Sequence, residues 1–257
     1  MGGLSRVLAV ASNTFRETIR ERVLYNLVFF AVLMTLCGLL LGHLSIRQDE
    51  KIIKDLGLAA MDVFGTLIAI FIGVGLVSKE IERRSLFPLL AKPLSRDEFL
   101  VGKAAGLAFT LLVNVAVMAI GLYVTLFFTG RAFDLALLKA VYGIYLGLVI
   151  TMALALFFST VTSSTIASVC TFSVVAAGRF SDVIRNVKQV AEGVPSFLTE
   201  SLYYVLPNFR NFDFKNAVVY GLPVPWDLLA RVTLYDAVYT AIVLLGALAV
   251  FRRKDFQ

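Results

Sequence analysis

Apolar residues along the chain fall into six long stretches that short polar connections separate. The stretches are 25–44, 58–77, 104–128, 136–158, 160–178 and 232–251. About 20 apolar residues are needed for a helix to cross the hydrocarbon core of a bilayer. The pattern therefore predicts an all-α polytopic membrane protein, with six transmembrane helices in one domain that covers residues 1–257. The connection between the fourth and fifth stretches is very short and uncharged, which predicts an antiparallel helical hairpin.

The segment before the first stretch has a different periodicity. Between residues 4 and 24, apolar side chains recur every three or four positions, and polar side chains lie on the opposite face. The apolar positions include Leu4, Leu8 and Phe15, and the polar ones include Arg6 and Arg20. This pattern predicts an amphipathic helix that lies in the headgroup plane.

Composition agrees with a membrane protein. Hydrophobic residues make up 59% of the chain and charged residues 16%, and the mean hydropathy is +0.84. These values exclude an ordinary soluble domain. The net charge is +6, but the basic residues flank the apolar stretches. They therefore indicate membrane topology, and no nucleic-acid partner is expected.

Basic residues in the short connections predict the orientation. Thirteen lie in the N-terminal helix, in the connection after the second stretch and in the tail, against five in the two short connections on the other side. The positive-inside rule then places both termini of this multi-pass chain in the cytoplasm.

The long connection 179–230 would face outward. Helical spacing of its apolar residues and several prolines predict short amphipathic helices that rest on the outer membrane face. Tyr203, Tyr204, Tyr220 and Trp226 would lie at the interface. This segment is also the candidate surface for a partner outside the cell.

Several kinds of chemistry have no motif in the chain. The Gly102-Lys103 pair has Asp97 where a phosphate-binding loop needs its first glycine. His43 is the one histidine, so no metal site is expected. The two cysteines, Cys37 and Cys170, lie in apolar stretches and predict no disulfide. We therefore expect no enzymatic activity and no cofactor in this chain.

Three charged residues lie inside the predicted spans, near their outer ends. They are Asp62, Lys139 and Asp236. With no ionisable residue at mid-membrane, the pattern argues against an ion-coupled carrier. The three form a candidate outer charge cluster, interpreted as interfacial solvation, a mutual ion pair or an outer gate. A lipid-modifying enzyme would need such a cluster as its active site.

Three G-x-x-x-G pairs indicate close helix packing in lipid. They are Gly38/Gly42, Gly102/Gly106 and Gly143/Gly147. The pattern leaves open whether the contacts lie within the chain or between two copies.

The most unusual connection is the cytoplasmic one, 79–98. A charge cluster is followed by an apolar run, then by Pro93, and Ser95 with Glu98 has the spacing of a capping box for the next helix. A segment that is both charged and apolar suits docking into a groove on a soluble partner; the alternative is a loop lying on lipid. Its candidate coupling residues are Glu80, Glu82, Arg83, Arg84, Leu86, Phe87, Leu89, Leu90, Lys92 and Arg96.

These motifs resemble a type-2 ABC transporter permease, and are most similar to the branch that contains the copper-enzyme-maturation permease of nitrous oxide reductase. The resemblance rests on Glu80 and Glu82, Pro93-Leu-Ser-Arg96, Gly102-Lys103, and also on Leu206-Pro-Asn-Phe and the basic tail 251–256. It extends over essentially the whole chain.

The resemblance implies a permease subunit that pairs with a separately encoded ABC ATPase and a second permease copy, in a homodimer. The coupling helix would be residues 80–92, and the complex would be an exporter or would do mechanical work. The nearly uncharged interior fits an apolar or amphipathic cargo. A non-transporting membrane scaffold is the main alternative, and a lipid-modifying enzyme is a weaker one.

Overall fold

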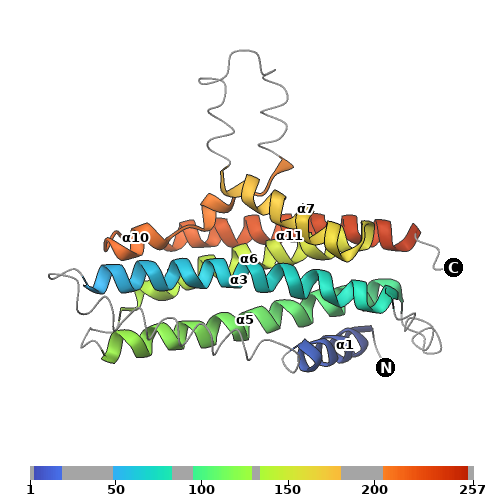
Figure 1. Cartoon of the computed structure of the whole chain (residues 1–257), viewed down its shortest axis with the longest axis horizontal. Helices are drawn as coiled ribbons and strands as arrows, with labels where there is room; N and C mark the ends of the chain where they lie inside the picture. Colours follow the sequence, from blue (N-terminus) through green and yellow to red (C-terminus); the bar gives the residue numbers. More distant parts are fainter. Residues whose placement is uncertain (1–2, 19–48, 83–94, 129–133, 181–204, 254–257) are drawn as a thin grey trace, which may run out of the picture.

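Four long helices lie side by side in the computed structural model, which describes residues 3–18, 49–82, 95–128, 134–180 and 205–253 (Figure 1). They are α3 (Asp49–Glu82), α5 (Arg96–Phe128), α6 (Ala136–Val161) and α11 (Trp226–Arg253). Within the described ranges these four are long and apolar enough to cross a membrane. They correspond to the second, third, fourth and sixth predicted spans.

The other two predicted spans have different outcomes. The first, 25–44, lies outside the described residues. The fifth corresponds to α7 (Ser164–Arg179), a helix of 16 residues. At 1.5 Å per residue it is about 24 Å long, which is shorter than the hydrocarbon core of about 30 Å. The hairpin between α6 and α7 is confirmed. The backbone is extended at Thr162, Ala167 of α7 packs with Ala155 of α6, and Gly178 and Gly147 both lie beside Phe209, so the two helices are antiparallel.

Helix α3 is much longer than its predicted span. It begins at Asp49, nine residues earlier, and it includes a polar first turn that sequence reasoning assigned to a loop. Lys54 explains the extension, because its Nζ lies 2.7 Å from Glu50 and 2.8 Å from Asp134. Farther along, Gly65 contacts Leu148 and Gly73 contacts Ala155, so α3 and α6 run in the same direction.

The N-terminal helix α1 (Gly3–Thr18) packs lengthwise on the first part of α5. Gly102 contacts Val10, and Gly106 contacts Thr14. The order of these contacts shows that the two helices run in the same direction. The second G-x-x-x-G pair therefore serves packing within the chain, and the placement of α1 in the headgroup plane stays a prediction.

The segment before α11 folds back onto the bundle. It contains a 3-10 helix, η3 (Phe209–Phe212), and a short helix, α10 (Lys215–Val219). Phe209, Phe212 and Phe214 are buried. They reach the backbone of α6 and α7 at Gly143 and Gly178. These three phenylalanines pack into the protein, which differs from the expectation that the segment rests on the membrane face. Tyr220 and Trp226 are exposed, so their predicted position at the membrane interface stays a prediction, and Tyr203 and Tyr204 lie outside the described residues.

The third G-x-x-x-G pair provides the room for this packing. A Cβ atom on Gly143 would lie 2.5 Å from Phe212 O, and one on Gly147 would lie 3.6 Å from the ring of Phe209. The absence of side chains at these two α6 positions lets the segment approach the helix backbone. This pair also acts within the chain, while Gly38/Gly42 lies outside the described residues.

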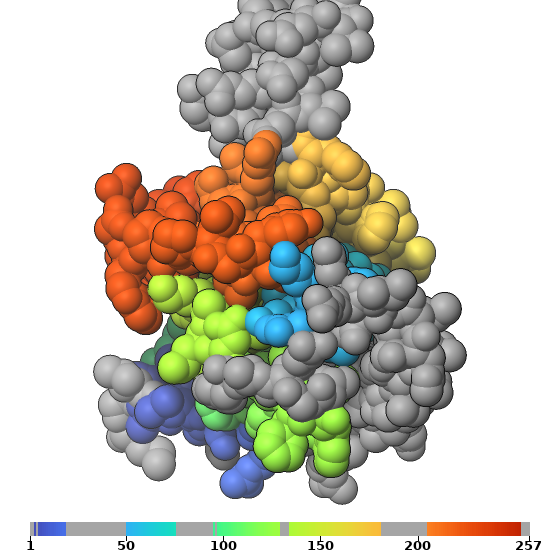
Figure 2. All heavy atoms as spheres, turned by 90° about the vertical axis from the view of Figure 1, so that its left-hand side faces the viewer, coloured from blue at the N-terminus to red at the C-terminus, as the bar shows by residue number. Residues whose placement is uncertain are grey.

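One end of the bundle holds α1, the end of α3, the start of α5 and the end of α11 (Figure 1). Arg252 of α11 donates two hydrogen bonds to Asp97 of α5, one of them at 2.8 Å. The opposite end, viewed in Figure 2, carries the starts of α3, α6 and α11 and the end of α5, with α10 beside them. We call these two ends the coupling end and the far end.

Candidate functional site

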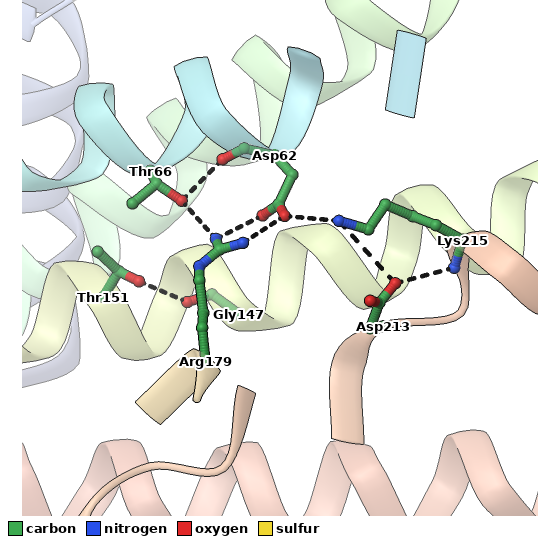
Figure 3. Close-up of polar contacts among 7 residues, drawn as sticks. All are labelled: Asp62, Thr66, Gly147, Thr151, Arg179, Asp213 and Lys215. Atoms are coloured by element: carbon green, nitrogen blue, oxygen red, sulfur yellow. Dashed lines mark hydrogen bonds and ion pairs between the residues drawn. The ribbon is translucent and has the colours of Figure 1, made fainter. Parts of the chain in front are cut away.

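The far half of the bundle contains an ion-pair network centred on Asp62 of α3 (Figure 3). Arg179, the last residue of α7, donates to both carboxylate oxygens, with Nη1–Oδ2 at 2.6 Å and Nη2–Oδ1 at 2.7 Å. Thr66 ties the pair to the helix: its hydroxyl accepts from Arg179 Nη2 at 2.9 Å and donates to Asp62 O at 2.7 Å. A bidentate contact of this kind fixes both the distance and the orientation of the guanidinium relative to the carboxylate.

A second cation completes the network. Lys215 at the start of α10 donates from Nζ to Asp62 Oδ2 at 2.8 Å. Asp213 lies 3.9 Å from the same nitrogen and accepts from the Lys215 amide at 3.2 Å. We refer to Asp62, Thr66, Arg179, Asp213 and Lys215 as the Asp62 network. It joins α3, α7 and the η3–α10 segment at one point.

The Asp62 network lies inside the bundle and not at its far end. Lys54 and Asp134 mark that end, and Asp62 follows Lys54 by eight residues, or about 12 Å along α3. Its carboxylate is largely buried, with 12% of the side chain exposed, whereas Arg179 is 35% exposed. Breaking such a contact leaves a charge in a poorly solvated position, which is costly even though the intact pair contributes little.

The predicted outer charge cluster does not form. Lys139 donates to Val224 O at 2.6 Å and lies 4.7 Å above the Trp226 ring. Within the described part of the chain, the ion pairs of Asp62 go to Arg179 and Lys215. The mutual ion pair with Lys139 is therefore a wrong prediction, because α7 supplies one cation, Arg179, and the folded-back segment supplies the other, Lys215. An enzymatic site that requires Asp62, Lys139 and Asp236 together loses its basis.

Asp236 lies deeper than its predicted position near the end of a span. Helix α11 begins at Trp226, six residues before the predicted span, so Asp236 is ten residues, about 15 Å, along the helix. The side chain is 7% exposed, and its Oδ1 has no hydrogen-bond partner in the described structure. Asp236 is therefore a buried ionisable residue well inside an apolar helix.

Asp134 lies at the far end, between α5 and α6. Burial alone would raise the pKa of its carboxyl. The hydrogen bonds from Lys54 and from the Ala136 amide, together with the positive charge of Lys54, outweigh burial and lower the pKa. Lys54 and Asp134 thus link the start of α3 to the α5–α6 connection.

The coupling end contains part of the predicted coupling segment. Glu80 and Glu82 are in the last turn of α3, and Arg96 begins α5. Arg83, Arg84, Leu86, Phe87, Leu89, Leu90 and Lys92 lie outside the described residues. A partner-binding role for this set therefore stays a prediction.

The predicted capping box at the start of α5 is confirmed. Ser95 Oγ accepts from the Glu98 amide at 3.2 Å, and Glu98 Oε2 accepts from the Ser95 amide at 3.1 Å. Arg6 of α1 lies 3.8 Å from Glu98 Oε2. The chain that leaves the coupling segment is therefore attached to α1 and, through Asp97, to the end of α11.

Sequence reasoning missed Arg179, Thr66 and Lys215. Arg179 was assigned to the border of a span, and Lys215 to a segment outside the bundle. One signal was available: Asp62 lies within an apolar stretch, and a charge there requires a partner. The partners are 117 and 153 residues away along the chain, so no local spacing identifies them.

Two comparisons with known proteins bear on the chain. A family model described as "ABC-2 family transporter protein" matches residues 8–256. No curated protein matches the chain.

Proposed function

We propose that this chain, which belongs to the ABC-2 family of transporter proteins and is a membrane-spanning permease subunit, serves an ATP-driven exporter. A separate ABC ATPase would bind the coupling end, which would face the cytoplasm of a bacterial-type inner membrane. Two permease copies would assemble into a homodimer. We also propose that the chain is most similar to the branch that contains the copper-enzyme-maturation permease of nitrous oxide reductase.

The observation that carries the proposal is the continuity of α3. The helix has 34 residues, about 51 Å at 1.5 Å per residue. It contains Asp62 in its far half and ends at Glu82, within the first residues of the predicted coupling helix 80–92. A push on the coupling segment would act on a rigid helix that holds the Asp62 network, and rigid-body motions of this kind are common in switching proteins.

The attachments of the coupling segment also support the proposal. Its other side leads into α5 through the Ser95–Glu98 capping box, and α5 contacts Arg252 through Asp97. A force on the segment would thus reach α1, α3, α5 and α11 together. The Asp62 network would act as a latch that holds α7 and α10 to α3 until the helices move.

The proposed docking contact follows from the residues of the segment. Leu86, Phe87, Leu89 and Leu90 would fill a groove on the ATPase, where each large side chain contributes about 1.5–3 kcal/mol on burial. Glu80, Glu82, Arg83 and Arg84 would set the register and discriminate between ATPases. A loop lying on lipid, the alternative, would need the same apolar residues for the membrane.

Co-purification of the ATPase with permease variants tests this function. Phe87→Ala and Glu82→Arg should lower ATPase capture at least tenfold and uncouple ATP hydrolysis from transport. Matched controls at the far end are Phe128→Ala, which removes an exposed ring, and Asp227→Arg, which reverses an exposed charge. Both controls should capture the ATPase normally.

The alternatives give different results. If the segment lies on lipid, Phe87→Ala changes little and Phe87→Asp impairs membrane insertion. If the protein is a scaffold, the ATPase binds but ATP hydrolysis moves no cargo. Undiminished capture and transport in both Phe87→Ala and Glu82→Arg would refute the coupling role.

A further inference from the structure

Asp236 is a buried carboxyl for which the described structure offers no counter-charge. It is 7% exposed, its Oδ1 lacks a hydrogen-bond partner, and no ion pair involves it within the described ranges. The Oγ1 of Thr240, one helical turn farther along α11, is also buried; it is the hydroxyl nearest to the carboxyl, but the two form no hydrogen bond of ordinary geometry. Unpaired ionisable side chains are rare inside membrane spans and mark functional positions when they occur.

The surroundings of Asp236 are fixed by one hydrogen bond between α6 and α11. Tyr142 and Thr233 share a hydrogen bond of 2.8 Å between their hydroxyl groups. Tyr145 and Asp236 each follow by three residues, so they face each other across the same interface, close enough to interact electrostatically. The Tyr145 hydroxyl donates to Ala108 O of α5 at 3.4 Å, which leaves it no proton for the carboxylate.

Charged groups on the neighbouring elements either pair with other residues or lie far from Asp236 along the bundle. On α5, Asp97 and Glu98 are at the coupling end, where they pair with Arg252 and Arg6; Lys103 lies over the Phe99 ring near that end. In the folded-back segment, Lys215 binds Asp62. Lys139 of α6 binds Val224 O and lies over the Trp226 ring at the start of α11. The other titratable groups of α6 and α11 near this position are the phenols Tyr142, Tyr145, Tyr235 and Tyr239, and the exposed pair Asp227 and Arg231 lies near the far end.

We propose that Asp236 is an intramembrane proton-binding site, in which the carboxyl holds a proton while α6 and α11 are packed together and releases it when they separate. An ionised carboxylate in this enclosed position would lack both water and a cation, whereas the protonated acid is neutral. In the opened state, water would solvate the carboxylate, and the proton would pass to that water.

Proton binding at Asp236 makes the closed state, in which α6 and α11 are packed together, depend on pH. The closed state binds one more proton than the open state, so closing becomes less favourable as the pH rises above the ordinary range of an aspartic acid. Below that range both states are protonated, and Asp236 contributes no difference. Asp236→Asn, which is neutral at every pH, should remove this dependence.

Helix α11 is suited to such opening, because only 17% of its most apolar window is buried within the protein. The corresponding value for α6 is 72%. Beyond the α6 interface, separation of α11 would disturb the hydrogen bonds of Tyr235 with Asn208, of Tyr239 with Val205 and of Arg252 with Asp97. The protonation of Asp236 at rest does not depend on the proposed export function. Only the release of the proton during ATP turnover rests on that proposed function.

Infrared spectroscopy of the full permease–ATPase complex in lipid nanodiscs tests the proposal. At neutral pH, the wild type should show the carbonyl band of a protonated carboxylic acid, and Asp236→Asn should lose it. Asp62→Asn is the matched control and should keep the band, because Asp62 is an ionised partner of Arg179 and Lys215. A wild-type spectrum in which Asp236→Asn removes only carboxylate bands would overturn the proposal.

Transfer to D2O tests release of the proton. The carbonyl band should shift as the acid exchanges to its deuterated form, at least tenfold faster during ATP turnover than at rest. Equal rates would overturn release during the cycle. If the ATPase fails to bind at all, the proposed function fails, and the resting spectrum of the permease alone still decides whether Asp236 is protonated.

Discussion

Asp62 and Asp236 are the same residue type in two long apolar helices, and both are buried, at 9% and 7% exposed. Their environments are opposite. Asp62 binds an arginine at the end of α7 and a lysine of the folded-back segment, while Asp236 faces a tyrosine and has no cation within the described structure.

The difference between these two sites has a physical consequence. An enclosed carboxyl needs either opposite charge or a proton. The first solution makes Asp62 a structural joint between three segments, and the second would make Asp236 a site that responds to opening. Variants of both residues should therefore behave differently.

The largest difference should appear when each carboxylate is replaced by its neutral isostere. Asp62→Asn leaves Arg179 and Lys215 facing an uncharged amide, and should destabilise the permease by about 3 kcal/mol. Asp236→Asn replaces one neutral group by another and should cost less than about 1 kcal/mol. Equilibrium unfolding in mixed SDS–detergent micelles measures both. Equal losses would mean that the two carboxyls are in the same charge state.

Close packing of the folded-back segment is the second determinant of the Asp62 network. Gly143→Ala would put a Cβ atom 2.5 Å from Phe212 O, and should cost about 2 kcal/mol because backbone atoms cannot easily move away. Gly75→Ala is the control, since no atom lies within 4 Å of its Cβ position. It should be neutral or slightly stabilising in the same unfolding measurement. Equal effects of the two changes would show that the segment does not pack on α6 as described.

A double-mutant cycle identifies the partner of Asp62. Asp62→Asn combined with Arg179→Met should show a coupling free energy of about 1.5 kcal/mol. The same cycle with Lys139→Met should be additive, because Lys139 binds the backbone at Val224. A coupling with Lys139 as large as that with Arg179 would restore the mutual ion pair predicted from the sequence.

Asp134 provides an intermediate case at the far end. Its side chain is 31% exposed and pairs with Lys54. Since the folded-state pKa is lowered, the pair stabilises the fold above the ordinary aspartate pKa, and this stabilisation is lost as the pH falls through the folded-state value. Asp134→Asn should cost about 1 kcal/mol at neutral pH and nothing in acid. A cost that is independent of pH would contradict this charge state.

Sequence patterns predicted the helices better than the contacts between them. Four spans, the α6–α7 hairpin and the Ser95–Glu98 capping box followed from hydropathy and local spacing, which depend on neighbouring residues. The Asp62 network did not, because its members come from three distant segments. The folded-back segment was misplaced for a related reason: the apolar periodicity of residues such as Phe209 and Phe212 is the same whether the helix packs on lipid or on protein.

Helix boundaries failed where polar residues extend a helix beyond its apolar core. Lys54 and Glu50 lengthen α3, and Trp226 begins α11 six residues early, so hydropathy underestimated both helices. That error put Asp236 near the end of its predicted span and concealed how far along α11 it lies. Glycine spacing indicated close packing correctly, but only the structure identifies the partners as α1 for Gly106 and the η3 segment for Gly143.

In the proposed mechanism, α3 carries motion from the coupling segment to the Asp62 network. Spin labels at Val63, which is 54% exposed on α3, and at Leu222, which is 59% exposed beside α10, report this link directly. The measurement uses the permease–ATPase complex with Cys37 and Cys170 replaced by serine. The distribution of distances between the two spin labels should shift when the ATPase is trapped in its ATP-bound state. Phe87→Ala should abolish the shift and Phe128→Ala should preserve it. An unchanged distribution in the otherwise unaltered complex, or a shift that survives Phe87→Ala, would contradict the account.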